Sequence, residues 1–230
     1  MSGDIAYDEI PYDGIAEWYD HWVGDDPGFI FKQAPDLLAG RLAGASVLDA
    51  ACGQGRVARE LARRGAAAVG VDVSRRLLAK AEAAEATDPL GVRYRVGDLT
   101  DPPAWWDGTP FDGAVCEMAL MDIHDAEASL AGIAHVLRPG AWFVTSLVHP
   151  CFPGNAKGMA SWSPERGYSD EGWWRSVGHN PEGVRIRVGA YHRTLATYLN
   201  ALTGVGLVLD RAVEPADDVP TILILDCHRR

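Results

Sequence analysis

A glycine-rich turn that follows a short apolar run is the strongest chemical signal in the sequence. The run, residues 46–49, ends in Asp49, and Gly53 and Gly55 follow before a stretch of helix-forming residues. Glycine lets the backbone approach a ligand closely because it carries no Cβ. Open α/β sheets bind ligands at the carboxyl ends of their parallel strands. The sequence therefore predicts a ligand site at this turn, with the Asp49 carboxylate beside it.

Two classes of ligand compete for this turn. Residues 53–58 match the G-x-G-x-x-A fingerprint of dinucleotide-binding folds, and Asp72 lies about where that fold carries its ribose-binding acid. Three features favour S-adenosylmethionine instead. Asp49 suits the ammonium group of a methionine moiety, Asp98 follows a third strand-like run, and the chain closes with two strand-like runs.

The elements that must position these residues alternate along the chain. Strand-like runs separated by helical stretches cover residues 46–49, 68–72, 92–96, 111–116 and 142–148. Such alternation predicts an open parallel sheet with helices on both faces. Pro139 and Gly140 are expected to end the helix that precedes the fifth strand. Residues 206–213 and 221–227 are separated by only seven residues, too few for a parallel crossover, which predicts an antiparallel hairpin.

One long segment does not follow this alternation. Residues 149–190 are rich in Gly, Pro and Ser and contain Trp162, Trp173 and Trp174, three of the eight tryptophans. Long segments without periodicity are usually lids or binding loops. We expect a single domain with four parts: a helical cap (1–40), a cofactor-binding core (41–148), an acceptor lid (149–193), and a C-terminal helix with a β-hairpin (194–230).

The combination of motifs, in this order, resembles the class I S-adenosylmethionine-dependent methyltransferases, in particular the bacterial members that act on small molecules. The resemblance runs from about Tyr12 to Cys227. It implies an α/β, Rossmann-like fold with a seven-stranded, mostly parallel sheet, an antiparallel C-terminal hairpin and an inserted lid. Ala51 departs from the family pattern, which has glycine at that position.

The resemblance also implies how S-adenosylmethionine binds. Asp49 and the glycines of the turn hold the methionine part, Asp72 accepts from the ribose hydroxyls, and Asp98 accepts from the adenine amine. Tyr19, on a helix that closes over the cofactor, and Arg56 are expected near the methionine carboxylate; a core aromatic and a solvated helix residue are the alternatives. The complete set of candidate cofactor residues is Tyr19, Asp49, Ala51, Gly53, Gly55, Arg56, Asp72, Val73, Gly97, Asp98, Leu99, Cys116 and Met121.

Two histidines are candidate catalytic residues. Methyl transfer needs a base only when the acceptor holds its proton, and histidine is the natural base near neutral pH. His149 directly follows the fifth strand, and His192 lies where the irregular segment returns to a helix. A structural hydrogen bond is the alternative role for each. Trp162, Trp173 and Tyr191 are expected to form walls of the acceptor pocket; a hydrophobic cap or a homodimer interface is the alternative.

Composition excludes several functions. The net charge of −11 disfavours nucleic acids and anionic membranes as partners. The four cysteines are widely spaced and no histidines show a metal-ligand spacing, so neither a disulfide framework nor a metal site is expected. No apolar run approaches 18 residues and the first residues do not resemble a signal peptide, so we expect a cytoplasmic protein.

The predicted reaction is methyl transfer from S-adenosylmethionine to an oxygen or nitrogen of a small aromatic or apolar molecule, which releases S-adenosylhomocysteine. Methylation of carbon, or of a peptide amine or carboxylate, is an alternative within the same class. The rivals from other classes are a non-catalytic cofactor-binding protein and an NAD-dependent oxidoreductase. None of the three lysines forms the Tyr-x-x-x-Lys pair that such an oxidoreductase would favour.

Overall fold

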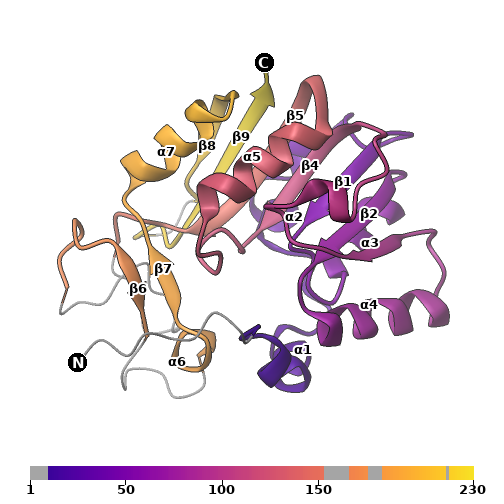
Figure 1. The fold of residues 1–230 in the computed structure, drawn as a ribbon, viewed down its shortest axis with the longest axis horizontal. Coiled ribbons are helices and arrows are strands. Elements are labelled where there is room, and N and C mark those ends of the chain that lie inside the picture. Colours follow the sequence, from indigo (N-terminus) through magenta and orange to yellow (C-terminus); the bar gives the residue numbers. More distant parts are fainter. Residues whose placement is uncertain (1–9, 153–165, 176–182, 216–217) are drawn as a thin grey trace.

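A central seven-stranded sheet organises the protein (Figure 1). The computed structural model describes residues 10–152, 166–175, 183–215 and 218–230. The strand order is β3-β2-β1-β4-β5-β9-β8; the first five strands are parallel, and β9 is antiparallel to both β5 and β8. This confirms the predicted fold class and C-terminal hairpin. The strands are β1 (Ser46–Ala50), β2 (Ala67–Asp72), β3 (Arg93–Val96), β4 (Phe111–Glu117), β5 (Leu137–Val148), β8 (Leu207–Val213) and β9 (Ile222–Arg229).

The helices connect and cover these strands. Three of them begin at residues whose side chains accept a hydrogen bond from the first turn, namely Ser74, Asp125 and Thr194. The α-helices are α1 (Ala16–Val23), α2 (Phe29–Gln33), α3 (Arg56–Arg63), α4 (Arg75–Thr87), α5 (Ala126–Val136), α6 (Val184–Arg187) and α7 (Leu195–Gly204), and short 3-10 helices span Asp13–Ile15, Pro35–Leu38 and Pro102–Ala104. Among the described residues, none of the helices combines the length and apolarity needed to cross a membrane.

Apolar clusters bury both faces of the sheet. Successive residues of a strand point to opposite faces, and in β1 Leu48 belongs to one cluster while Val47 belongs to the other. The first cluster includes Leu130 of α5 and the second includes Leu61 of α3. Helices therefore cover both faces, as in a doubly wound α/β fold.

The start of the fifth strand differs from the sequence-based expectation. Helix α5 already ends at Val136, and β5 begins at Leu137 rather than at Trp142. Leu137 is buried and pairs with Phe111 of β4, and the pairing register then shifts before it continues. Because Leu137 already pairs with β4, Pro139 and Gly140 lie within β5 and do not end the helix as predicted.

The described part of the irregular segment contains regular structure. Strands β6 (Gly172–Trp174) and β7 (Ala190–His192) form an antiparallel pair, and α6 lies between them in the chain. Figure 1 shows these elements together, apart from β1–β3, with α1 between α6 and α4 at the bottom of the view. The N–H of Tyr191 donates to the Met121 carbonyl (2.7 Å), which joins β7 to the loop after β4.

Candidate functional site

The glycine-rich turn between β1 and α3 requires left-handed backbone. Ala51, Gly53 and Gly55 have φ values of 58°, 55° and 79°. A Cβ on Gly55 would lie 2.8 Å from the Ala81 Cβ and would overlap the Tyr94 side chain. Gly55 is therefore required both by its conformation and by its packing. Ala51 keeps the left-handed conformation, so the departure from the family pattern leaves the turn unchanged at the cost of local strain.

Asp72 holds this turn to the neighbouring strand. Its carboxylate accepts from the Gly53 N–H and from the Ser74 N–H, each at 2.8 Å. Burial raises its pKa. Val73 beside it is exposed. Each carboxylate oxygen can accept more than one hydrogen bond, so the structural role of Asp72 is compatible with an additional contact to a ligand.

The turn after β3 brings Gly97, Asp98 and Leu99 to the same edge. The Gly97 N–H donates to the Asp72 carbonyl (3.0 Å). A Cβ on Gly97 would lie 2.8 Å from the Trp105 Cβ, so glycine is needed for close packing. The Asp98 side chain is exposed and accepts from the N–H and hydroxyl of Thr100, both at 2.8 Å, and Leu99 is buried. The structure thus places the turns after β1, β2 and β3 next to one another.

Asp49 and Gln54 present buried polar atoms that lack partners. Asp49 is 1% exposed, and within the described residues neither its Oδ2 nor the Gln54 Nε2 has a hydrogen-bond partner. Burial, reinforced by the Glu117 charge, raises the pKa of Asp49 to about 8. A cation beside Asp49 would favour its charged form. One acceptor and one donor are thus available, and they are complementary to an ammonium and a carboxylate. The sequence analysis missed Gln54, although it lies between the two glycines.

The N-terminal part of the chain is attached to this edge by several contacts, among them those of Arg56 and Glu117. Arg56 donates to the Asp26 carbonyl, and its guanidinium lies 3.6 Å from the Asp26 carboxylate. The buried Glu117 carboxylate at the end of β4 accepts from the Phe29 and Ile30 N–H groups at 2.6 and 3.3 Å. Arg56 thus holds the cap in this structure. Glu117 is a second residue that the sequence analysis missed.

Two aromatic rings of the cap lie between the turn and the lid. Tyr19 of α1 packs edge-on against Tyr12, with 4.9 Å between ring centroids. Burial raises the Tyr19 pKa, and both Arg56 at the turn and Arg185 of the lid act in the opposite direction. Tyr19 is therefore close enough to both the glycine-rich turn and the lid for their charges to influence its pKa.

Residues 116–122 run from the end of β4 toward the lid. Cys116 is buried, and burial raises the pKa of its thiol. Met118 is a second non-glycine residue with left-handed backbone (φ 53°). Ala51 and Met118 thus follow the ends of two adjacent strands, β1 and β4. Strained backbone of this kind clusters at functional sites.

A buried polar cluster joins the cap, this loop and the lid. Arg185 of α6 is paired with Asp122 and also donates to the Gly189 carbonyl (3.0 Å). Tyr12 lies near the same carboxylate, and burial raises the pKa of both Tyr12 and Asp122. No local sequence pattern indicates this cluster, because its members come from three separate segments.

Both ring nitrogens of His149 are engaged. The Cys151 N–H donates to Nδ1 (3.2 Å), so Nε2 carries the proton and donates to the Glu214 carboxylate (2.8 Å). The ring is 2% exposed. Structural hydrogen bonds, the alternative role named above, account for both ring nitrogens of His149. Its role as a catalytic base stays a prediction.

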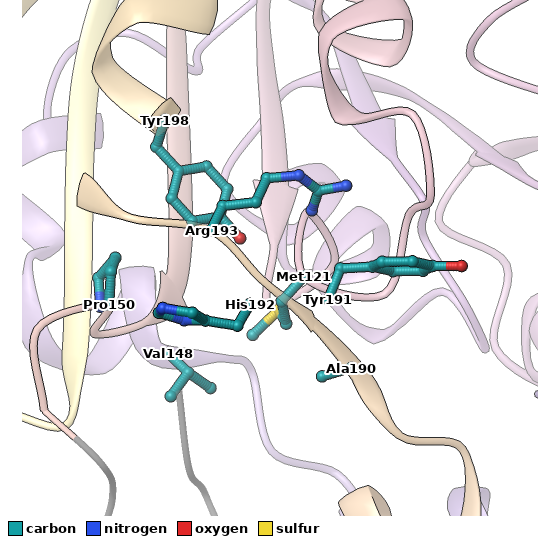
Figure 2. A pocket seen from close by; sticks show the side chains of 8 residues that line it. All are labelled: Met121, Val148, Pro150, Ala190, Tyr191, His192, Arg193 and Tyr198. Atoms are coloured by element: carbon teal, nitrogen blue, oxygen red, sulfur yellow. The ribbon is translucent and has the colours of Figure 1, made fainter. Parts of the chain in front are cut away.

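His192 lies in a small pocket at the end of β5 (Figure 2). Its Nε2 donates to the Tyr168 carbonyl (2.6 Å). The cavity has a volume of about 10 Å³, room for about one water molecule. It is lined by Met121, Val148, Pro150, Ala190, Tyr191, His192, Arg193 and Tyr198. The structure therefore brings His192 and Met121 together.

The two faces of the small sheet carry different residues. Trp173 pairs with Tyr191, whereas Trp174 pairs with Ala190 and Gly172 with His192. Paired residues share a face and successive residues alternate, so Trp174 lies on the face of His192, opposite Trp173 and Tyr191. Figure 2 shows the Tyr191 and His192 rings on opposite sides of β7. Trp162 lies outside the described residues.

Trp174 is therefore the tryptophan on the same face of the small sheet as His192, and it was not among the predicted site residues. It is 5% exposed and belongs to the same apolar cluster as Met121 and Val148. The two-residue alternation of β6 would have identified it, but a strand of three residues is too short to recognise from periodicity. In the described residues, no group of three His, Cys, Asp or Glu side chains is arranged to hold a metal ion.

Comparisons with known proteins agree with this geometry. A family model described as a methyltransferase domain matches residues 47–140. The ubiquinone biosynthesis O-methyltransferase of Xylella fastidiosa (strain 9a5c) is 31% identical over 121 residues, which cover 53% of this chain and 46% of the relative. The enzyme of that name from Chromobacterium violaceum is 30% identical over 151 residues, which cover 62% and 64%. The chain thus matches about half to under two thirds of the length of these relatives.

A solved structure extends the likeness beyond the cofactor-binding core. The S-adenosylmethionine-dependent methyltransferase from Mesorhizobium loti superimposes with a TM-score of 0.66 and 26% identity, covering 85% of this chain and 96% of that one. The family predicted from the four strand-end motifs is confirmed. Over the matched residues and in its fold, the chain is similar to the class I S-adenosylmethionine-dependent methyltransferases.

Proposed function

We propose that this chain transfers the S-methyl group of S-adenosylmethionine to an oxygen or nitrogen of a small organic molecule and releases S-adenosylhomocysteine. The observation that carries the proposal is the pair of buried, unpartnered groups at the glycine-rich turn, Asp49 Oδ2 and Gln54 Nε2. An acceptor and a donor fit the ammonium and carboxylate of an amino acid, which S-adenosylmethionine has and a nicotinamide cofactor lacks.

The remaining cofactor contacts follow from the order of the strand ends. Asp72 would accept from the ribose, and Asp98 with Leu99 would bind the adenine, because these turns follow β2 and β3 at the same edge of the sheet. Met121 and Cys116, after β4, would flank the sulfonium. Tyr19 would cover the methionine part from the side of the cap.

The cofactor, when bound, supplies a methyl group that is already activated on a sulfonium. The contribution of the protein is then to orient the two reactants and to exclude water. Glu117 and Arg56 hold the cap over the strand ends, and the Asp122–Arg185 pair holds the lid to the loop after β4. His149 and His192 remain the candidate bases, and each also makes a structural hydrogen bond, to the Glu214 carboxylate and to the Tyr168 carbonyl.

The acceptor would lie under residues 149–193. The curated relatives are named as O-methyltransferases of ubiquinone biosynthesis, which supports an oxygen acceptor without naming the substrate of this chain. Aromatic side chains of the lid, including Trp174, suit a flat molecule.

Calorimetry tests the proposal. The wild type should bind S-adenosylhomocysteine and not NADH, and Asp49→Asn should weaken S-adenosylhomocysteine binding at least about tenfold, because a charge-assisted hydrogen bond is lost. Asp218→Asn, an exposed acid between β8 and β9, is the matched control and should bind like the wild type. Binding of NADH alone would refute the proposal. Incubation with S-adenosylmethionine and candidate phenols, followed by mass spectrometry, would separate an enzyme from a non-catalytic binding protein.

A further inference from the structure

Two buried hydrogen-bond donors of the lid lack partners. Among the described residues, Trp174 Nε1 and Arg185 Nε have no hydrogen-bond partner, and the residues are only 5% and 3% exposed. Most buried polar groups in native proteins are hydrogen bonded, and an unpaired one is costly. Each of these donors therefore needs an explanation, and the interactions described for Trp174 and Arg185 above do not provide one.

Both donors belong to the piece of the lid that contacts the loop after β4. Trp174 pairs with Ala190, which lines the pocket of His192 and Met121. Arg185 bonds to the carbonyl of Gly189, the residue before Ala190, and its guanidinium reaches Asp122, the residue after Met121. Through these contacts, Trp174 and Arg185 belong to the part of the lid that adjoins residues 121–122, beside the predicted position of the sulfonium.

The chemistry of the two groups restricts what they can bind. Indole and guanidinium nitrogens only donate, so the missing partner must be a hydrogen-bond acceptor. Arg185 is already paired with Asp122, and the Tyr12 hydroxyl lies near the same carboxylate. The cluster is therefore close to neutral, and a carboxylate would bring a second anion beside Asp122. A neutral oxygen satisfies both conditions.

We propose that Trp174 and Arg185 recognise the methyl acceptor through a neutral oxygen, such as that of a phenol, an ether or a ketone. This proposal rests on the proposed function and extends it, because it assigns two specificity-determining residues and a chemical class to the acceptor side. A hydrocarbon or an ammonium group in this position would leave both donors unpaired.

Three one-ring probes distinguish a neutral oxygen, a hydrocarbon and a carboxylate: anisole, ethylbenzene and benzoate. Anisole and ethylbenzene have nearly the same shape, and the oxygen of anisole can only accept. With S-adenosylhomocysteine at saturation, the wild type should bind anisole at least tenfold more tightly than ethylbenzene or benzoate. The indole N–H resonance of Trp174, assigned by its loss in Trp174→Phe, should shift when anisole is added and stay in place with ethylbenzene.

Two variants and one control test the residues themselves. Trp174→Phe keeps the ring but removes the donor, and Arg185→Lys keeps the charge beside Asp122 but has no Nε; each should lose most of the preference for anisole. Trp142→Phe, near the start of β5 and at the opposite end of that strand from Val148, should keep it. Thermal melting checks that each variant is folded, and if neither variant folds, the wild-type indole shift decides, with the Trp174 resonance assigned by triple-resonance NMR of the wild type.

Several outcomes would overturn the proposal. They are equal binding of anisole and ethylbenzene, tighter binding of benzoate, an unshifted Trp174 indole at saturating anisole, or an undiminished preference in both folded variants. Absence of any binding by anisole would also overturn it. Failure of the proposed function would appear earlier and separately, as failure to bind S-adenosylhomocysteine before any probe is added.

Discussion

The glycine-rich turn and the lid are built in opposite ways. The turn is made by neighbouring residues whose backbone conformation fixes it, with Ala51, Gly53 and Gly55 all left-handed. The lid is held by contacts between distant segments, such as the pair of Asp122 with Arg185, 63 residues apart. Both nevertheless contain buried groups that lack partners. The turn offers an acceptor and a donor, whereas the lid offers two donors. This difference fits the proposal that each region binds a different reactant.

The largest effect should come from breaking the long-range attachment of the lid. Arg185→Met would leave the Asp122 carboxylate buried without its cation, which typically costs about 3–5 kcal/mol. Because the pair joins the lid to the core, amide hydrogen exchange of residues 183–192 should become roughly 100-fold faster or more. The double variant Asp122→Leu/Arg185→Met removes both charges and should recover part of the protection. Unchanged exchange in the single variant would show that the lid is held by other contacts.

The glycine-rich turn should lose stability when a substitution conflicts with its left-handed backbone. In Gly55→Ala, the new Cβ would overlap Tyr94 and Ala81 at a left-handed position, so the free energy of unfolding should fall by about 2–4 kcal/mol. Urea denaturation measures this change. Gly204→Ala is the control, since a Cβ there meets nothing within 4 Å and the residue ends α7; its stability should stay the same or rise. Equal stability of the two variants would contradict the packing argument.

The difference in construction also explains what the sequence could reveal. The sheet, its hairpin and the turn were predictable because each depends on a contiguous pattern, such as the apolar run that ends in Asp49. Strand β6 has only three residues, so no periodicity identified the face of Trp174. The contact of Glu117 with Phe29 spans 88 residues and left no local pattern. Long-range contacts of this kind had to be read from the structure.

The pH dependence of cofactor binding would sharpen the role assigned to the turn. The pKa of Asp49 is about 8 in the ligand-free protein, so the carboxyl is mostly protonated at pH 6. If a bound ammonium requires the ionised form, binding releases a proton. Affinity for S-adenosylhomocysteine should then rise with pH between 6 and 8, by up to about tenfold per unit.

Asp49→Asn isolates this group from Asp72 and Glu117, whose pKa values are also raised by burial. Calorimetry across this pH range, in buffers with different ionisation enthalpies, should show a weaker pH dependence and less proton release in the variant. A wild-type affinity that is flat over the same range would contradict the proposed contact between Asp49 and the ammonium.

The smallest expected effect is a gain in stability. Ala51→Gly relieves the left-handed strain at the start of the turn and should raise the free energy of unfolding by roughly 1 kcal/mol. Ala62→Gly, inside α3, should lower it by a similar amount, because glycine is unfavourable in a helix. Urea denaturation of both variants should therefore give changes of opposite sign, and a loss of stability in both would mean that Ala51 is not strained.

The central claim is that unpartnered buried groups mark the two reactant sites, and the turn gives the most direct test. Methylthioadenosine lacks the amino-acid end of S-adenosylhomocysteine, so it cannot use Asp49 or Gln54. By calorimetry, the wild type should bind S-adenosylhomocysteine at least 100-fold more tightly than methylthioadenosine, since two charge-assisted contacts are each worth about a factor of ten or more. Asp49→Asn should reduce this ratio at least tenfold while leaving methylthioadenosine binding unchanged. Equal affinities for the two compounds in the wild type, or an unchanged ratio in the variant, would contradict the account.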